Sequence, residues 1–323
     1  MTAHTMLEDR ATVEALLGAL IHAPSSHNTQ PWLVRLHTDA VDLIADRTRA
    51  LPVNDPDDRE LTISCGAALL NLRVAAAAAG YAADVRTLPD AADADLLARV
   101  ALQPASAERA DAALQPAVAA RRTYRQRFAP DAIGAAAVHA LADAARREGA
   151  TLTVLDTPDA RLRAAELVAE GDAAQWANPS WRRELAAWMH PRREGDGLAT
   201  PSLAVPLAQA VVRTFDMGHG VGAKDRQLAD ESPLLAVLWT DGDTPADWLA
   251  AGQALQRVLL TAVQHGLQAS YLNQPVQVPA LRPKLQQLTG RPGYAQLLLR
   301  LGVPAQALPP APRRPMADIV VTD

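Results

Sequence analysis

A loop between Pro24 and Pro31 holds six adjacent side chains with hydrogen-bonding capacity, from Ser25 to Gln30. Pro31 disfavours the α conformation in the residue before it and has no backbone N–H, so a preceding helix must stop here. The loop runs directly into a strand-like segment, residues 32–36. Its polar capacity exceeds what a turn requires. Two interpretations follow: a site for a flat polar ligand, or a heavily capped turn.

A second group of reactive side chains is the arginine cluster at residues 121–128, which places four arginines and the hydroxyl of Thr123 within seven residues. Guanidinium groups match phosphate oxygens in pairs, so the cluster indicates an anion site; the alternative is a solvated basic linker. Near the C-terminus, prolines flank Arg313 and Arg314 and hold them extended. If this tail folds back, its arginines join the same anion site; otherwise it is a loose basic tail.

Three other patterns carry less weight. Residues 218–223 fit the glycine pattern of a dinucleotide-binding turn, but they lack a strand–helix–strand frame, and residues 224–233 read as a poorly packing helix. Ser26 and His27 are adjacent but have no G-x-S-x-G context, so no hydrolase is indicated. The eight histidines show no metal-ligand spacing.

Composition narrows the function classes. The 323 residues suffice for two lobes, and the net charge of −5 argues against a nucleic-acid partner. Cys65 is the single cysteine, which excludes an internal disulfide and suits a reducing compartment. The polar start and the lack of a long apolar run predict no signal peptide and no membrane span. We therefore expect a soluble cytoplasmic protein.

The chain also repeats itself. Glycine, alanine and leucine positions around Gly66 recur around Gly252, 186 residues later, and each segment ends at a glycine 14 residues on, Gly80 and Gly266. Both read as long helices preceded by acidic, proline-containing caps. Chance similarity between alanine-rich helices is the alternative, but the shared glycine spacing favours duplication.

The remaining pattern predicts an α+β protein. The first lobe reads as a helix at 8–22, a hairpin of strands 32–36 and 41–45, and the long helix around Cys65, with 104–116 as the connection between lobes. The second reads as a helix at 132–148, a strand at 151–155, a helix capped by Thr157, and buried strands at 234–240 and 295–301. The irregular stretch 191–206 is typical of a lid, a binding loop or disorder.

These motifs resemble the nitroreductase family of flavoproteins, specifically its Acg-type branch of duplicated, FMN-binding members. The resemblance rests on residues 23–32 (APSSHNTQPW), 121–128 (RRTYRQRF), 252–256 (GQALQ) and 313–315 (RRP). It implies two fused nitroreductase-like lobes, 1–118 and 119–323, each with a mixed sheet packed by helices, which together mimic the family homodimer. The loop and the arginine cluster each occur once, so one complete flavin site and one degenerate site are expected, in a pseudo-dimeric monomer whose further dimerisation stays open.

The resemblance also implies residue roles. The FMN phosphate would be held by the arginine cluster and the tail: Arg121, Arg122, Thr123, and Arg313 or Arg314. Arg125 would lie near flavin N1 and O2. The first-lobe loop would reach the ribityl chain and ring edge through Ser25, Ser26, Asn28 and Gln30, and the segment with Asn273 and Gln274 would supply a backbone donor near N5. No catalytic side chain and no metal are expected.

The implied activity is transfer of a hydride from NAD(P)H through the flavin to a small acceptor such as a nitroaromatic or quinone. The alternative is an FMN-holding protein with little turnover, in which residues 176–206, including Trp176, Trp181 and Trp188, form a lid over the flavin. Those tryptophans could equally be the buried face of an amphipathic helix beside a surface loop. A third interpretation is an anion-binding protein without flavin.

Overall fold

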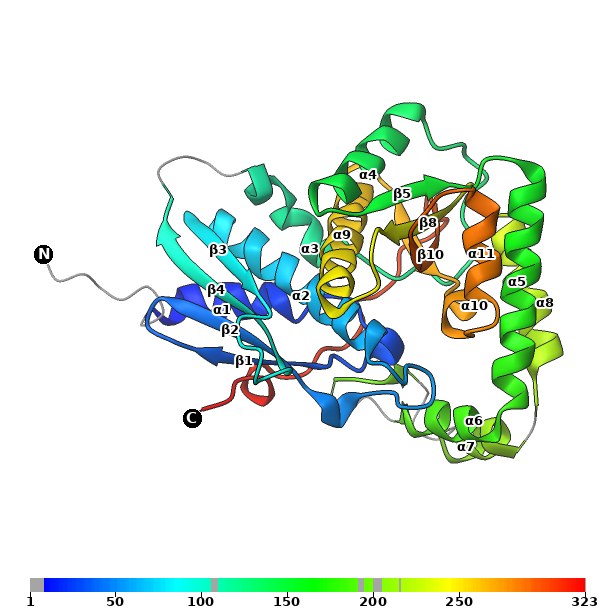
Figure 1. Ribbon diagram of the computed structural model, residues 1–323, viewed down its shortest axis with the longest axis horizontal. Coiled ribbons are helices and arrows are strands. Elements are labelled where there is room, and N and C mark those ends of the chain that lie inside the picture. The colour runs from blue at the N-terminus through cyan, green and yellow to red at the C-terminus, as the bar shows by residue number, and fades with distance from the viewer. Residues whose placement is uncertain (1–8, 106–109, 191–194, 200–204, 215, 323) are drawn as a thin grey trace, which may run out of the picture.

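A computed structural model describes residues 9–105, 110–190, 195–199, 205–214 and 216–322, and shows two four-stranded sheets with helices packed on them (Figure 1). The first sheet has the order β1 (Trp32–Leu36), β2 (Ala40–Ala45), β4 (Leu96–Pro104), β3 (Tyr81–Thr87). The second has the order β5 (Thr151–Val154), β8 (Leu234–Thr240), β10 (Tyr294–Gly302), β9 (Gln268–Tyr271). The expected α+β class with two sheets is confirmed.

The two sheets have the same topology. In each sheet, the first two strands in the sequence are neighbours and are followed by a long helix. The fourth strand then pairs with the second, and the third strand lies at the edge beside the fourth. The helices are α2 (Arg59–Ala78) and α9 (Pro245–Gln264), both 20 residues long and offset by the same 186 positions as the sequence repeat. A helix precedes each unit: α1 (Arg10–Leu20) and α4 (Ala135–Arg147). The repeated sequence therefore occupies equivalent places in the two sheets' topology.

Helices α2 and α9 cross at the centre of the molecule, between the sheets (Figure 1). A Cβ added to Gly66 would lie 2.3 Å from the carbonyl oxygen of Leu249, and one added to Gly252 would lie 2.0 Å from that of Ile63. The repeated glycines thus let the two backbones touch. By length and composition α2 is apolar enough to cross a membrane, which the sequence expectation missed, but 89% of that window is buried inside the protein. It is a core helix because its neighbours cover it on nearly every side.

Two segments pack against the sheet of the other lobe: the C-terminal tail and the residues that follow α3. The C-terminal tail runs back to β1, where the amide of Val34 donates to Ile319 and the amide of Val321 donates to Val34. After the first lobe, the amide of Tyr124 donates to the carbonyl of Ala269 in β9. Each crossing forms one parallel bridge at a sheet edge, whereas the described strands of both four-stranded sheets pair antiparallel. The mixed character expected of each sheet is confined to these edges.

Between β5 and β8 the second lobe carries an insertion that the first lacks: α5 (Pro158–Ala177), α6 (Pro179–Ala187), β6 (Met189–His190), β7 (Leu198–Ala199), α7 (Val205–Thr214) and α8 (Gly218–Asp230). Residues 191–194 and 200–204 of the expected irregular stretch lie outside the described residues. The glycine pattern at 218–223 begins α8 and follows no strand. The prediction of a poorly packing helix at 224–233 was wrong, because those glycines let α8 pack closely along α5.

The remaining elements are short. Helices α10 (Gln274–Gln277) and α11 (Arg282–Thr289) join β9 to β10, and 3₁₀ turns lie at Ser26–Asn28, Arg47–Arg49 and Met316–Asp318. Within the expected connection at 104–116, a 3₁₀ turn at Ala110–Leu114 leads into α3 (Gln115–Ala120). This stretch is held because Leu114, Ala117 and Val118 are buried in the first core.

Candidate functional site

Two adjoining cavities lie where the lobes meet, with volumes of about 410 and 240 Å³. Both are lined by residues of the N-terminal loop, the arginine cluster and the inserted segment: Pro24, Ser25, Thr123, Arg125 and Leu198. They are therefore two chambers of one site, which we call the large and the small chamber. Neither lobe encloses it alone.

The N-terminal loop enters the site in a constrained conformation. His27, Asn28 and Gln30 have positive φ angles of 50°, 56° and 52°, a region that costs energy for residues with a side chain. Hydrogen bonds hold them there. The Ser25 hydroxyl accepts from the Gln30 amide at 2.9 Å, and the Ser26 hydroxyl donates to Glu60 at 2.6 Å. This strain, supported by contacts on both sides, presents Ser25, Ser26 and Asn28 to the chambers.

The small chamber is strongly cationic. It is lined by Arg121, Arg122, Arg125 and Arg313, and no carboxylate lies among its described lining residues. Arg121 is only 5% exposed and makes two long contacts, both 3.4 Å, to Thr123 and to the His22 carbonyl. Its Nε atom is buried and has no partner in the described part of the chain, and the same holds for the Nε atom of Arg313. Cationic donors left unsatisfied in a cavity are the arrangement that binds an anion.

Electrostatics supports the same conclusion. Burial, followed by repulsion from Arg121, lowers the pKa of Arg313 to about 9. Burial also lowers the pKa of Arg121 and of Arg125, with mutual repulsion among the cluster adding to it for Arg121. The charged forms are therefore held at a cost, which a bound anion relieves.

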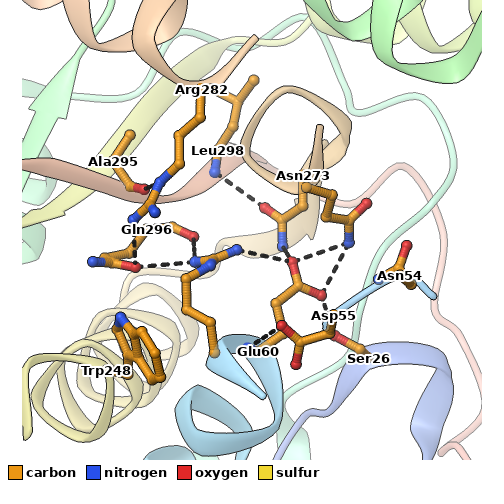
Figure 2. Close-up of polar contacts among 12 residues, drawn as sticks. Ser26, Asn54, Asp55, Glu60, Trp248, Asn273, Arg282, Ala295, Gln296 and Leu298 are labelled. Atoms are coloured by element: carbon orange, nitrogen blue, oxygen red, sulfur yellow. Dashed lines mark hydrogen bonds and ion pairs between the residues drawn. The ribbon is translucent and has the colours of Figure 1, made fainter. Parts of the chain in front are cut away.

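The large chamber joins the lobes through a buried carboxylate (Figure 2). Glu60, at the start of α2, accepts from Ser26 of the first lobe and from Asn273 and Gln277 of the second, the last at 3.0 Å to each oxygen. Asn273 in turn accepts from the Leu298 amide at 3.1 Å, which fixes it against β10. The network thus positions the segment after β9 opposite the N-terminal loop.

Hydrogen bonds to Asp55 and to Gln296 hold the start of α2, which carries Glu60, in place (Figure 2). The carboxylate of Asp55 accepts from the amides of Glu60 and Leu61 at 3.0 and 2.9 Å. Burial and the neighbouring Glu60 charge raise the pKa of Asp55 to about 6. Arg59 donates to the carbonyl and the side chain of Gln296 in β10, at 2.7 and 3.0 Å.

Most of the residues predicted from the sequence converge here. The small chamber is lined by Ser25, Asn28, Arg121, Arg122, Thr123, Arg125 and Arg313, and the large one by Ser25, Ser26, Thr123, Arg125, Asn273 and Gln274. Arg122 lines the chamber, but its guanidinium also donates to the carbonyls of Ala119 and Arg121.

Gln30 and Arg314 are the exceptions, since neither is among the described lining residues of the two chambers. The Gln30 side chain donates to the Gly195 carbonyl at 2.9 Å and accepts from the Arg314 amide at 3.0 Å. The Arg314 guanidinium donates to the carbonyls of Gln30 and Asp318, at 2.8 and 2.9 Å, and pairs with Asp46. Both therefore fasten the tail to the first lobe, because their polar atoms are already satisfied there.

Sequence reasoning missed several lining residues, among them Glu60, His27, Asp172 and Asp225. Glu60 carried a weak signal, since it follows a cap at the start of a long apolar helix. Asp172 carried a clearer one, because it interrupts an otherwise buried helical face that includes Ala165. Tyr271, the last residue of β9, also lines the large chamber, and its hydroxyl is buried with no partner among the described residues.

The region predicted as a lid forms part of the wall. Trp176 and Trp181 line the large chamber, whereas Trp188 lies under Arg49, 5.7 Å from the guanidinium carbon to the ring centre. The Gly197 amide donates to the Asn28 carbonyl at 3.3 Å, and Asp196 pairs with Arg49. The described part of this region thus lies against the N-terminal loop.

Comparison with known proteins gives relatives along the whole chain. No family model matches. A Mycobacterium tuberculosis (strain H37Rv) protein named "Putative NAD(P)H nitroreductase" is 33% identical over 326 residues, which cover 98% of this chain and 93% of the relative. A second protein of that name from the same strain, acg, is 31% identical over 305 residues, with 92% and 91% covered.

Solved structures show more distant similarity. The FMN- and NADPH-dependent nitroreductase NfnB of a Sphingopyxis species is 18% identical over 65% of this chain and 98% of its own, with a TM-score of 0.42. A Bacteroides fragilis nitroreductase with bound FMN is 16% identical over the same shares, with a TM-score of 0.40.

Proposed function

This chain belongs to the nitroreductase family, as relatives at 31–33% identity over more than nine-tenths of its length show, and we propose that it is an FMN-dependent oxidoreductase. Its reductant is NAD(P)H, and its acceptor is a small molecule such as a nitroaromatic or a quinone. The observation that carries the proposal is a small chamber lined by Arg121, Arg122, Arg125 and Arg313, with no carboxylate among its described lining residues, that adjoins a larger chamber.

The residues present fit FMN. A phosphate supplies acceptor oxygens for the Nε atoms of Arg121 and Arg313, which have no partner among the described residues, and Thr123 adds a hydroxyl beside Arg121. Arg122 contributes charge to the same chamber. Ser25 and Asn28 line the small chamber, and Ser25 lines the large one as well, so both are available as hydrogen-bonding partners of a ribityl chain.

When bound, the flavin ring supplies the two-electron chemistry. The chain contributes position and electrostatics. Arg125 lines both chambers, so its charge favours the negative charge that the ring acquires on reduction. Asn273 and Gln274 begin α10 beside the large chamber and would present backbone donors to the ring edge. Ser26 and Glu60 hold the opposite wall.

We further propose that lobes 1–118 and 119–323 act as fused subunits with one complete site. In the second lobe, the position equivalent to the N-terminal loop reads Arg-Arg-Glu-Gly-Ala-Thr at 146–151. There Glu148 pairs with Arg73 and Arg257, both at 2.6 Å. Internal ion pairs thus take the place of a second ligand site.

The first experiment is the colour and flavin content of the purified protein. We expect about one FMN per chain, extracted and identified by chromatography. A colourless protein that FMN does not reconstitute would contradict the proposal.

A second candidate function is flavin holding with little turnover. It is favoured by the wall that Trp176, Trp181 and Leu198 form around the large chamber, where a nicotinamide or acceptor would stack. Anaerobic mixing with NADH or NADPH separates the two functions. Rapid bleaching supports the oxidoreductase, whereas a flavin that only dithionite reduces supports holding.

A further inference from the structure

The large chamber extends into a recess between α5 and α8, away from the arginine cluster. One face of α5 supplies Asp172, Gln175 and Trp176, and one face of α8 supplies Val221, Lys224, Asp225 and Leu228. These spacings of three and four residues place each set on a single helical face. The two helices lie side by side at the edge of the second lobe (Figure 1).

Glycines bring the polar groups of this recess together. A Cβ added to Gly171 would lie 2.6 Å from the Cβ of Gln274, so Gly171 allows α5 to touch the start of α10. A Cβ added to Gly222 would lie 3.3 Å from the Ala169 carbonyl oxygen, which shows how closely α8 packs on α5. The recess is therefore assembled by three helices at close approach.

Its hydrogen bonding has a surplus of acceptors. The single side-chain amide nitrogen of Gln274 donates to both Asp172 and Asp225, at 3.2 and 2.9 Å. The second carboxylate oxygen of Asp172 and the Gln274 carbonyl oxygen are buried, and neither has a partner among the described residues. Asp172 itself is 3% exposed. Buried acceptors without donors are costly unless a ligand supplies the donors.

The nearby cations do not remove this deficit. Lys224 and Arg300 line the same chamber, but the terminal nitrogens of Arg300 donate to the carbonyls of Tyr124 and Gln126. Burial, with repulsion from Asp225, raises the pKa of Asp172 to about 7. Burial also raises the pKa of Asp225, against the attraction of Arg300 and Lys224. The Nε atom of Arg300 is also buried without a partner among the described residues, but no described cation forms a hydrogen bond or ion pair with either carboxyl group.

Beside Asp172, one turn further along α5, the wall of the recess becomes aromatic. Trp176 and Trp181 meet edge to face with ring centres 5.5 Å apart, and the Trp181 indole nitrogen donates to Asn54 at 2.9 Å. That bond fixes the indole and satisfies its polar atom, which leaves ring surface toward the chamber. Such a wall suits a planar aromatic ligand.

We infer that this recess binds the donor-rich cationic head, an ammonium or amidinium group, of a planar aromatic acceptor. Asp172, Asp225 and the Gln274 carbonyl receive its N–H groups, and Trp176 and Trp181 pack against its ring. The inference rests on the proposed function, since it specifies the class of acceptor for that same site.

The test is direct binding to the oxidised holoprotein without reductant. Three probes share one ring and differ in charge: 4-nitrobenzylamine, which is cationic at neutral pH, neutral 4-nitrobenzyl alcohol, and anionic 4-nitrobenzoate. Quenching of tryptophan fluorescence gives each Kd. We expect the amine to bind about tenfold more tightly than the alcohol, the size of one charge-assisted hydrogen bond, and the benzoate to bind most weakly.

Variants Asp172→Asn and Asp225→Asn should each reduce the amine-to-alcohol ratio, and the double variant should bring it to about one. Asp156→Asn removes an exposed carboxylate outside the chambers and should leave the ratio unchanged. Flavin content is measured on every variant. An equal affinity for amine and alcohol in the unmodified protein, or a ratio that survives the double variant, would overturn the inference.

Failure of the proposed function looks different. It appears as a protein that does not take up FMN, and the same fluorescence titrations can still be made on that flavin-free protein. If the protein is yellow and is reduced by NAD(P)H but shows no preference for the amine, the cation-binding role of the recess is refuted and the proposed function stands.

Discussion

The crossing of α2 and α9 predicts that adding one methyl group at its centre is destructive. In Gly66→Ala the new Cβ would lie 2.3 Å from the Leu249 carbonyl oxygen, and an ordinary contact begins near 3.4 Å. The helices must therefore move apart by about 1 Å. Overpacking a core costs about 1–3 kcal/mol, and because the opposing atoms are backbone we expect about 3 kcal/mol.

The matched control has the opposite sign. Gly18 lies inside α1, and a Cβ added there meets nothing within 4 Å. Gly18→Ala should raise the free energy of unfolding by about 0.5–1 kcal/mol, because alanine loses less backbone entropy than glycine in a helix. Both variants are compared by urea denaturation at the same flavin saturation, since bound flavin adds its own stabilisation.

A double variant tests the geometry. Gly252→Ala faces the same crossing, with its Cβ 2.0 Å from the Ile63 carbonyl oxygen. Once one methyl has separated the helices, the second should cost less than it does alone, so Gly66→Ala and Gly252→Ala should be less than additive. Single variants as stable as the unmodified protein, or strictly additive costs, would refute a backbone contact at this position.

Three further predictions concern the site and its supports. Arg121→Ala should raise the Kd of the flavin-free protein for FMN about 10- to 100-fold, because a charge-assisted contact is lost. The control Arg127→Ala removes an exposed arginine and should leave this Kd unchanged. Equal Kd values for Arg121→Ala and the unmodified protein, measured by flavin fluorescence titration, would show that other residues hold the phosphate. Arg314→Ala should lower the free energy of unfolding by about 3 kcal/mol, because it leaves the buried carbonyl of Gln30 and the carboxylate of Asp46 unpaired. A folded variant that loses FMN affinity but no stability would contradict this structural role. Burial opposes ionisation of Asp243, yet hydrogen bonds led by Arg282 lower its pKa to about 2, below the unfolded value of 3.8. Its stabilisation is therefore present above about pH 4 and is lost as the pH falls toward 2, so Asp243→Asn should flatten the acid limb of a stability–pH profile.

The sequence predicted the parts of this protein that local chemistry specifies. Prolines and consecutive polar residues marked the N-terminal loop, and the recurrence around Gly66 and Gly252 marked two equivalent helices. Strand and helix positions followed from periodicity because burial on one face repeats every two or 3.6 residues. The arginine cluster could be recognised because four arginines lie within seven residues and no acidic residue stands among them.

Helix α8 shows where local reasoning failed. The sequence predicted a poorly packing helix at 224–233, and glycine weakens an isolated helix. In the folded protein the lack of side chains at Gly218 and Gly222 allows α5 to approach, and that packing outweighs the propensity. Asp172 and Asp225 converge through this contact although 53 positions separate them in the sequence.

The arginine pair at the C-terminus shows the division most plainly. Arg313 and Arg314 are adjacent and chemically identical, so the sequence left open which of them reaches the anion site. Extended backbone points neighbouring side chains to opposite sides, and the tail's attachment beside β1 sets which side is which. Arg313 therefore lines the small chamber, while Arg314 is satisfied by Gln30 and Asp46. The sequence alone determined that adjacent cationic donors are present. Only the tertiary structure decided which of them are left without partners, because this depends on residues hundreds of positions away in the sequence.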